Sequence, residues 1–523
     1  MKTKLHTHRF TAGRKATAFA AGLLLLSSVS FAQSQQAVID AMMKEEMGNS
    51  QLQTLAHELL DEIGPRLVAS PQMKKANDWA VAKYKSWGVD AHNEKWGEWR
   101  GWERGISHID MVSPWVRSLQ GTQLAWSPGM GDKTTTAEVI ILPNLADSNA
   151  FKAWLPSVKG KFVMISASTL SGRSDVNLKQ FATPTTYEKL NADARDITTE
   201  WATRIKNTGY AVKTLPLAIE KAGAAGIITN YWSKEFGADK IFDAHTKMIP
   251  SVDIGMEDYN LLFRLIQSGG KPSLRIHCES KELGMQPTYN TIGTIKGSEK
   301  PNEYVMLSAH FDSWDGGTGA TDNGTGTLTM IEAMRLLQKF YLHPKRTIIV
   351  GHWSSEEEGL NGSHAFVEDH PEVTKNLQAL FNQDNGTGRV ISMSGSGFKE
   401  SGAFFDRWLA AVPDTLKKRI HTQFPGRPSG GGSDNASFDM VGAPGFSLGA
   451  LNWGYSTITW HTNLDTYDKI IFDDLKNNAL LTAIMVYMAC EDPQTLPHTA
   501  ADGVTWPTQT MSIRNGRLED LKK

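Results

Sequence analysis

The sequence predicts an α/β protein with a mixed central sheet flanked by helices and a smaller domain inserted into it. Several segments with the apolar, β-favouring content of buried strands end in polar, glycine-rich loops, and helical periodicity follows. A shift in composition near Gly129–Thr136 opens a second set of short strands and helices. The length of 523 residues and the hydrophobic content of 40% allow two or three domains and a large core.

The first 32 residues are expected to be a signal peptide and not part of the fold. Basic residues between Lys2 and Lys15 precede a mostly apolar run, Ala18–Val29, and Ser30–Ala32 offers a small-x-small cleavage site. The apolar run is short for a membrane span, and no later segment approaches twenty uninterrupted apolar residues. We therefore expect a periplasmic or secreted protein with no membrane span in the mature chain.

Charge and cysteine content narrow the classes of partner and metal site. A net charge of −2 gives no indication of a nucleic-acid partner or an acidic membrane surface. The two cysteines, Cys278 and Cys490, are too few for a thiolate zinc site, and the sequence does not decide whether they pair. Any metal must therefore be held by histidines and carboxylates.

The α/β domain is expected to consist of two stretches, 33–124 and 286–495, which flank the inserted unit at 125–285. A polar C-terminal tail, 496–523, is expected to pack loosely. Periodicity predicts helices at 50–63, 73–87, 187–207 and 257–268, and strands at 137–142, 160–166 and 273–278.

A candidate metal site begins at the end of a buried-type strand, residues 303–309. His310 follows this strand directly, Asp312 comes two residues later, and a glycine-rich loop then delivers Asp322 before a helical pattern. Ligands of open α/β sheets lie at the carboxyl ends of the strands. Imidazole and carboxylate together suit zinc, and an aspartate near a histidine can orient it.

Three consecutive glutamates, Glu356–Glu358, follow the next predicted strand, 346–353. Such a run is ordinarily a solvated surface feature. Here it sits between a buried-type strand and a glycine turn, where repulsion between the carboxylates needs a compensating cation. Adjacent glutamates could then divide the work, one ligating metal and the other moving protons.

Two further segments complete a candidate set. The strand 377–381 leads to Asp384, and residues 458–460 precede His461. A two-metal site needs two histidines, two terminal carboxylates and one bridging carboxylate. The sequence supplies that number in the set His310, Asp322, Glu357, Asp384 and His461.

The motifs that hold these residues resemble those of the co-catalytic di-zinc exopeptidases. In order they are H-F-D-S-W-D, G-A-T-D-N-G-T-G, E-E-E-G, N-Q-D-N-G and H-T-N-L-D-T. The family includes bacterial secreted aminopeptidases, glutamate carboxypeptidase and plasma glutamate carboxypeptidase. The inserted unit resembles the protease-associated domain through K-A-G-A-A-G-I-I and I-P-S-V-D-I.

The resemblance implies a phosphorylase/hydrolase-type α/β fold, a peptide substrate and two zinc ions per chain, and it is compatible with a homodimer. It makes Asp322 the carboxylate that bridges both zincs. His310 and Asp384 would complete one zinc site, and Glu357 and His461 the other.

The resemblance also implies the catalytic groups. Glu356 would be the general base and acid, and Asp312 would orient His310. The triple glutamate leaves a second register open, with Glu357 as the base and Glu358 as the ligand, although the E-E-x-G-L spacing favours the first.

Two weaker expectations concern the loop geometry and the substrate pocket. The family often has a cis peptide bond after the bridging aspartate, so Asp322–Asn323 is a candidate for it. Ser433 and Asp434 lie where relatives carry substrate-binding residues. A glycine-rich turn without substrate contact is an equally good interpretation of that stretch.

Three functions fit a fold of this kind. The first is a zinc exopeptidase, either an aminopeptidase or a dipeptidase. The others are a glutaminyl cyclase with one zinc and a non-catalytic protein of transferrin-receptor type. The complete five-ligand set favours the exopeptidase. Neither the end of the peptide that is held nor the preferred side chain follows from the sequence.

Overall fold

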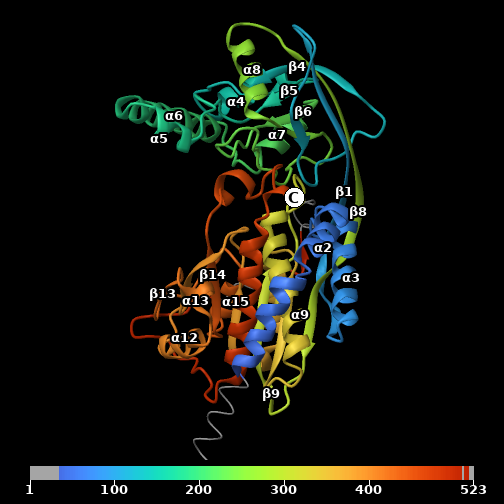
Figure 1. The fold of residues 1–523 in the computed structure, drawn as a ribbon. Coiled ribbons are helices and arrows are strands. Elements are labelled where there is room, and N and C mark those ends of the chain that lie inside the picture. The colour runs from blue at the N-terminus through green and yellow to red at the C-terminus, as the bar shows by residue number, and fades with distance from the viewer. Residues whose placement is uncertain (1–34, 509–511, 517–523) are drawn as a thin grey trace, which may run out of the picture.

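The computed structural model describes residues 35–508 and 512–516, so the expected signal peptide lies outside the described residues. The predicted fold class is confirmed. A central mixed sheet with strand order β13-β12-β14-β11-β9-β10-β8 is flanked by helices, and a second, smaller layered unit sits above it in Figure 1.

The centre of the sheet is parallel and its flanks are mixed. Strands β9, β10, β11 and β14 pair in parallel, and β8 runs antiparallel to β10. Strand β12 runs antiparallel to β14 but parallel to the edge strand β13. Strands β10 and β11 are buried along their whole length, as their apolar content predicts. The bounds are β8 Ser273–Ile295, β9 Lys300–His310, β10 Arg346–Trp353, β11 Leu377–Asn382, β12 Val390–Ser394, β13 His421–Gln423 and β14 Gly445–Ala450.

Helices cover both faces of this sheet. The larger core lies on one face, under a helix over residues 35–49 and the elements α2 Leu52–Ala56, η1 His57–Ile63, α3 Pro71–Ser86, α9 Thr325–Phe340, α12 Ser401–Ala410 and α15 Phe472–Glu491. Helices α10 Asn361–Asp369 and α14 Asn435–Asp439 contribute to a core on the other face, and α11 Pro371–Lys375 follows α10. Helix α15 is buried on most of its surface, and its central stretch from Ala479 to Val486 is apolar except for Thr482.

The upper unit in Figure 1 has a sheet and a hydrophobic core of its own. Its strands β4 Thr135–Ile141, β5 Phe162–Met164, β6 Gly226–Thr229, β7 Ser251–Ile254 and β3 Gly121–Gln123 continue the sheet outward from β8. Its helices are α4 Ser148–Trp154, α5 Asp175–Phe181, α6 Pro184–Asn207, α7 Leu215–Lys221 and α8 Met256–Gln267. The core residues of this unit run from Ile109 to Cys278.

Two long strands join the upper unit to the main domain. Strand β1, Asp90–Ser113, pairs antiparallel with β8 from Asp90↔Thr294 to Ser113↔Ser273. The sequence predicts a strand at 273–278 that ends within the inserted unit, but in the structure this strand continues as β8 to Ile295 in the main domain. The reason is the pairing with β1, which provides hydrogen-bond partners for the backbone N–H and C=O groups of β8 between the upper unit and the main domain.

The two cysteines lie in different cores and are both free. Cys278 belongs to the upper core and Cys490 to the core beneath α15. Among the described residues, no helix combines the length and the apolar character that a membrane crossing requires.

The expectation that the tail packs loosely is wrong for its described part. Leu496 is 1% exposed, and the Trp506 ring lies 4.5 Å from that of Phe398. The fully buried Arg346 donates hydrogen bonds to carbonyls of Asp492 and Gln494. This guanidinium satisfies backbone carbonyls of the segment that leads into the tail, and no motif in that segment predicts the contact.

Candidate metal centre

Five side chains far apart in the sequence meet at the carboxyl ends of the parallel strands. His310 is the last residue of β9, Glu357 follows β10, and Asp384 follows β11. Asp322 lies in the turn η3, Ala320–Gly324, just before α9, and His461 follows the turn η4, Tyr455–Thr459. The structure thus brings together every residue of the predicted ligand set.

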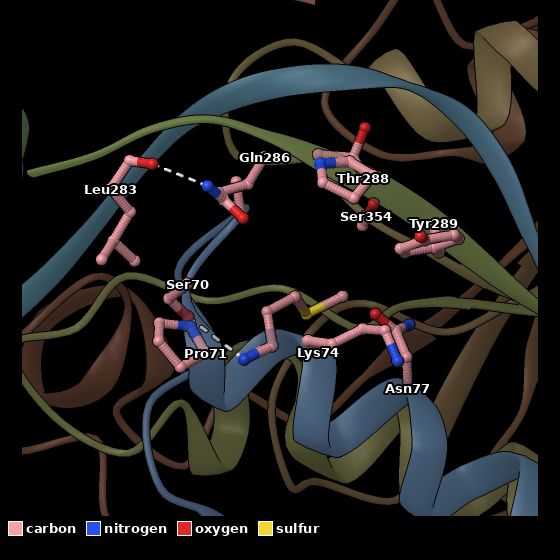
Figure 2. A pocket seen from close by; sticks show the side chains of 12 residues that line it. Ser70, Pro71, Lys74, Asn77, Leu283, Gln286, Thr288, Tyr289 and Ser354 are labelled. Atoms are coloured by element: carbon pink, nitrogen blue, oxygen red, sulfur yellow. Dashed lines mark hydrogen bonds between the residues drawn. The ribbon is translucent and has the colours of Figure 1, made fainter.

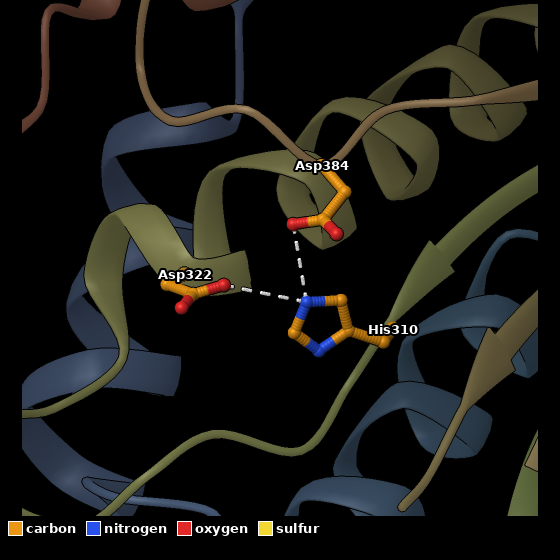
Figure 3. Close-up of side chains that lie close together, drawn as sticks. All are labelled: His310, Asp322 and Asp384. Carbon is orange, nitrogen blue, oxygen red and sulfur yellow. Dashed lines mark hydrogen bonds and ion pairs between the residues drawn. The ribbon is translucent and has the colours of Figure 1, made fainter. Parts of the chain in front are cut away.

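The five residues form two groups that share Asp322. In the first, His310 Nε2 lies 3.4 Å from Asp322 Oδ1 and 3.2 Å from Asp384 Oδ1, as Figure 3 shows. In the second, His461 Nε2 lies 3.3 Å from Asp322 Oδ2 and 2.9 Å from Glu357 Oε2. Each carboxylate oxygen of Asp322 therefore faces a different histidine.

The donor set fits a pair of divalent cations. In each group the candidate ligand atoms lie within 4.8 Å of one another, and all are imidazole nitrogens or carboxylate oxygens. Asp322 Oδ2 and Glu357 Oε1 are buried and have no hydrogen-bond partner among the residues that the structure describes. Burial, followed by the charge of Asp322, raises the pKa of Glu357 well above its usual range. Bound cations would relieve this crowding, and the nitrogen and oxygen donors suit zinc.

The loop that carries Asp322 is fastened on both sides. The Asp322–Asn323 peptide bond is cis, as expected. The Asn323 side chain donates to the Gln383 carbonyl at 2.9 Å and accepts from the Gly326 N–H at 3.1 Å. A Cβ on Gly326 would lie 2.4 Å from the Gln383 carbonyl oxygen, so only glycine allows this approach.

Asp312 contacts both a ligand and the glutamate loop. His310 Nδ1 lies 3.1 Å from the main-chain carbonyl oxygen of Asp312 and 3.7 Å from its carboxylate. Donation from Nδ1 to that carbonyl would leave Nε2 directed at the cluster. The Asp312 carboxylate accepts the backbone N–H groups of Glu356 and Glu357 at 3.2 and 3.3 Å.

The glutamate run separates into different environments. Of the three, only Glu357 belongs to a candidate ligand group within the described part of the chain. Burial raises the pKa of Glu356 well above its usual range; His310 opposes the shift, and Asp384 adds to it. This arrangement favours Glu357 as the ligand and Glu356 as the proton-carrying neighbour.

Ser433 and Asp434 lie close to the cluster but inside the protein. The Ser433 hydroxyl accepts from Asn382 at 2.8 Å, and Asn382 accepts from Ser308 at 2.7 Å. Asp434 is fully buried, and burial raises its pKa to about 7, with a smaller opposing effect of His310. These hydrogen bonds connect Ser433 to the ends of strands β9 and β11. A contact of Ser433 or Asp434 with substrate stays a prediction.

Two residues that the sequence analysis did not single out support the cluster. The fully buried Arg66 donates to the carbonyls of Phe311, Thr318 and Gly319 at 2.7–2.8 Å, and thereby fixes the loop between His310 and Asp322. The Asp465 carboxylate accepts the Asp322 N–H. Asp465 could have been suspected from its place in H-T-N-L-D-T, whereas Arg66 follows the predicted helix 50–63 and belongs to none of the motifs.

The upper unit contacts the candidate metal site through a short loop. The Ile241 N–H donates to the His461 carbonyl at 2.9 Å, and the Asp239 N–H donates to Asn463 Oδ1 at 2.9 Å. The Phe242 ring meets the His461 imidazole edge to face at 5.4 Å. One of the predicted ligands is therefore held in place by both units.

A cavity of about 340 Å³ lies apart from the ligands, between the start of α3 and β8. Figure 2 shows Lys74 on its α3 wall and Gln286 and Tyr289 on its β8 wall. It reaches Ser354 at the end of β10 but includes none of the five candidate ligands.

A paired histidine–carboxylate cluster at the carboxyl edge of such a sheet is an arrangement of two-metal hydrolases, aminopeptidases among them. The model of Peptidase family M28 matches residues 290–486, which include all five candidate ligands. The chain is a metallopeptidase whose residues 290–486 are similar to this family.

Relatives of similar length support the assignment over most of the chain. Carboxypeptidase Q of Mus musculus is 24% identical over 441 residues, covering 84% of this chain and 86% of that protein. Carboxypeptidase Q of Homo sapiens is 24% identical over 442 residues, covering 84% and 85%.

Solved structures show the same fold. A Peptidase M28 precursor from Shewanella amazonensis superimposes with a TM-score of 0.65 at 23% identity, covering 89% of this chain and 99% of that one. A zinc aminopeptidase from Bacillus subtilis gives a TM-score of 0.53 at 20% identity, covering 86% and 97%.

Proposed function

We propose that this chain is an exported di-zinc exopeptidase that hydrolyses a peptide bond at a chain end. The observation that carries the proposal is Asp322, whose two oxygens face two separate histidine–carboxylate pairs. A structural ion needs only one closed set of ligands, whereas a shared carboxylate is the arrangement of a two-metal hydrolytic site.

The five candidate ligands divide into two sets, one for each zinc ion. His310 and Asp384 would hold one ion, Glu357 and His461 the other, and Asp322 both. When bound, the ions would polarise the scissile carbonyl and lower the pKa of water. The name of the Bacillus subtilis neighbour, a zinc aminopeptidase, supports zinc as the metal.

Glu356 is the group that moves protons. Its high pKa in the unmetallated site reflects burial and neighbouring carboxylates, which a pair of cations would counteract. Glu356 would take a proton from the attacking water and deliver it to the leaving amine. Asp312 holds the backbone on which Glu356 and Glu357 are presented, so the two glutamates keep a fixed relative position.

We further propose that the upper unit, whose core begins at Ile109, contains the inserted protease-associated domain predicted at residues 125–285, and that residues 1–32 direct export. The separate core of the unit and its docking on His461 support the first assignment. The basic and apolar N-terminal pattern supports the second.

The proposal is tested by the hydrolysis of free dipeptides, N-blocked dipeptides and C-amidated dipeptides, before and after metal stripping. A di-zinc exopeptidase loses activity on chelation and regains it with added zinc. It also discriminates against substrates with a blocked terminus. A glutaminyl cyclase would instead release pyroglutamyl product from N-terminal glutamine, and a non-catalytic protein would turn over none of these peptides.

A further inference from the structure

The ammonium group of Lys240, which has no carboxylate partner among the described residues, lies beside the candidate metal site. Lys240 Nζ lies 3.7 Å from the centroid of the Trp460 ring. That ring packs in turn on the His461 imidazole, with centroids 4.0 Å apart. Within residues 35–508 and 512–516, Lys240 Nζ forms neither an ion pair nor a hydrogen bond. The aromatic face attracts the cation but leaves its three N–H donors free.

The backbone fixes this ammonium near the ligands. Lys240 forms an antiparallel β-bridge with Thr462, next to His461 in the chain. The Lys240 N–H donates to the Tyr231 carbonyl at 3.0 Å, and the neighbouring Ile241 N–H donates to the His461 carbonyl. Because both flanks are hydrogen-bonded, the base of the side chain cannot swing away from the loop that carries His461.

The surroundings favour an incoming anion. Burial lowers the pKa of Lys240, and the charge of Lys234 adds to this effect, while Asp322 opposes it. A partly desolvated cation without a counter-ion gains more from an anion than a solvated one does. Arg66, a second cation close to the cluster, already donates to main-chain carbonyls.

We propose that Lys240 binds the α-carboxylate of the substrate, so that the C-terminal residue is the one released. This inference rests on the proposed function, because it orients the peptide across the same metal centre. Every peptide with a free C-terminus carries such a carboxylate. The substrate class is therefore dipeptides and other peptides with a free C-terminus, and not C-terminally blocked chains.

Three substrates separate the sources of the carboxylate: Ala-Leu, Ala-Leu amide and Ala-Glu amide, in which the only carboxylate is the glutamate side chain. The zinc-loaded enzyme is expected to favour Ala-Leu over both amides in kcat/KM by about 10- to 100-fold, the range of one charge-assisted hydrogen bond. Preference for Ala-Glu amide over Ala-Leu would overturn the α-carboxylate assignment.

Variants identify the residue. Lys240→Met keeps an unbranched stem over Trp460 but removes the charge, so the ratio of kcat/KM between Ala-Leu and its amide should fall toward one, mainly through KM. Lys240→Arg should restore much of the preference. Lys234→Met, which removes the same charge from an exposed position nearby, should keep it. Zinc content is measured in every variant, and rates are expressed per zinc-loaded enzyme.

The outcomes are distinguishable from failure of the proposed function. If the zinc-loaded wild type hydrolyses neither Ala-Leu nor Ala-Leu amide, the exopeptidase proposal itself fails. If it hydrolyses both equally, or if Lys240→Met keeps the wild-type ratio, the peptidase stands and the role of Lys240 is overturned.

Discussion

The Asp465 carboxylate accepts a hydrogen bond from the backbone N–H of Asp322 at 3.0 Å and a second one from the N–H of Thr321 at 2.7 Å. Asp465 thereby fixes the backbone of the residue whose side chain both candidate metal groups share. Burial raises the pKa of Asp465 to about 7, and the charge of Asp322 adds to this shift. Bound cations would stabilise both carboxylates in their ionised form.

Asp465→Asn should weaken zinc binding while the fold persists. An asparagine can accept one of the two N–H bonds, but its amide group opposes the other N–H. Loss of a partner that orients a ligand typically costs about 10- to 100-fold in metal affinity. Competition with a fluorescent zinc chelator measures this. Asp468→Asn, a nearby exposed carboxylate, is the control, and equal zinc affinity of the two variants would contradict the role of Asp465.

Glu356→Gln should retain zinc yet lose about 10²- to 10⁴-fold in kcat, the range for removal of a general acid–base group. Glutamine keeps the shape of the side chain but cannot accept and return the proton. Steady-state kinetics measures the loss of kcat, and metal analysis measures the retained zinc. Glu358→Gln is the matched variant, and we expect near-normal zinc and activity for it. Zinc loss in Glu358→Gln with zinc retained in Glu357→Gln would establish the other register.

A buried carboxyl group in the helix over residues 35–49, away from the candidate metal site, should make the stability of the protein depend on pH. Burial, and then hydrogen bonding and repulsion with Glu332, raise the pKa of Glu46 to about 9. A carboxyl group with a raised folded-state pKa contributes least at high pH, so stability falls as pH rises from about 4.5 to about 9. Glu46→Gln should therefore increase the free energy of unfolding at pH 8, by at least about 1.4 kcal/mol, the equivalent of one pKa unit.

The gain should disappear near pH 4, where Glu46 is protonated in both states. Denaturant unfolding of the metal-free protein at the two pH values measures it. Glu45→Gln is the control of opposite sign, because hydrogen bonds from Lys339 and Arg335 lower the pKa of Glu45 to about 2. That variant should be destabilised at pH 8. A Glu46→Gln protein less stable than wild type at pH 8 would refute this assignment.

The contact between the upper unit and the metal loop should control zinc retention. Asn463 accepts from the Asp239 N–H and donates to the Gly237 carbonyl at 3.0 Å. Asn463→Ala removes both bonds and should loosen the support of His461, giving faster zinc loss and earlier proteolysis near residues 235–243. Time courses of chelation and limited proteolysis measure these changes. Asn452→Ala, outside this contact, should behave as wild type in both assays.

The ligand cluster could be predicted from the sequence because most of its residues directly follow recognisable strands. His310, Glu357 and Asp384 each follow a buried strand with a clear apolar pattern, and parallel strands end at one edge. The fold class followed from the same alternation of strands and helices. Assignment of the bridging role to Asp322 came from the family resemblance, and the structure places that carboxylate between both histidines.

Long-range contacts were not predictable in the same way. The continuity of β8 depends on its ladder with β1, which lies about 180 residues earlier. The position of the segment just before the tail depends on Arg346, and the position of Lys240 depends on a bridge to Thr462. Each of these pairs residues that have no shared sequence pattern, so periodicity and motifs could not reveal them.

The most direct test of the central claim is the zinc content per chain by elemental mass spectrometry, for the wild type and Asp322→Asn. We predict two zinc ions in the wild type. We also predict a substantial loss from Asp322→Asn, because both groups share this carboxylate. A wild-type chain that retains a single ion, or an Asp322→Asn chain that retains two, would contradict the two-metal site.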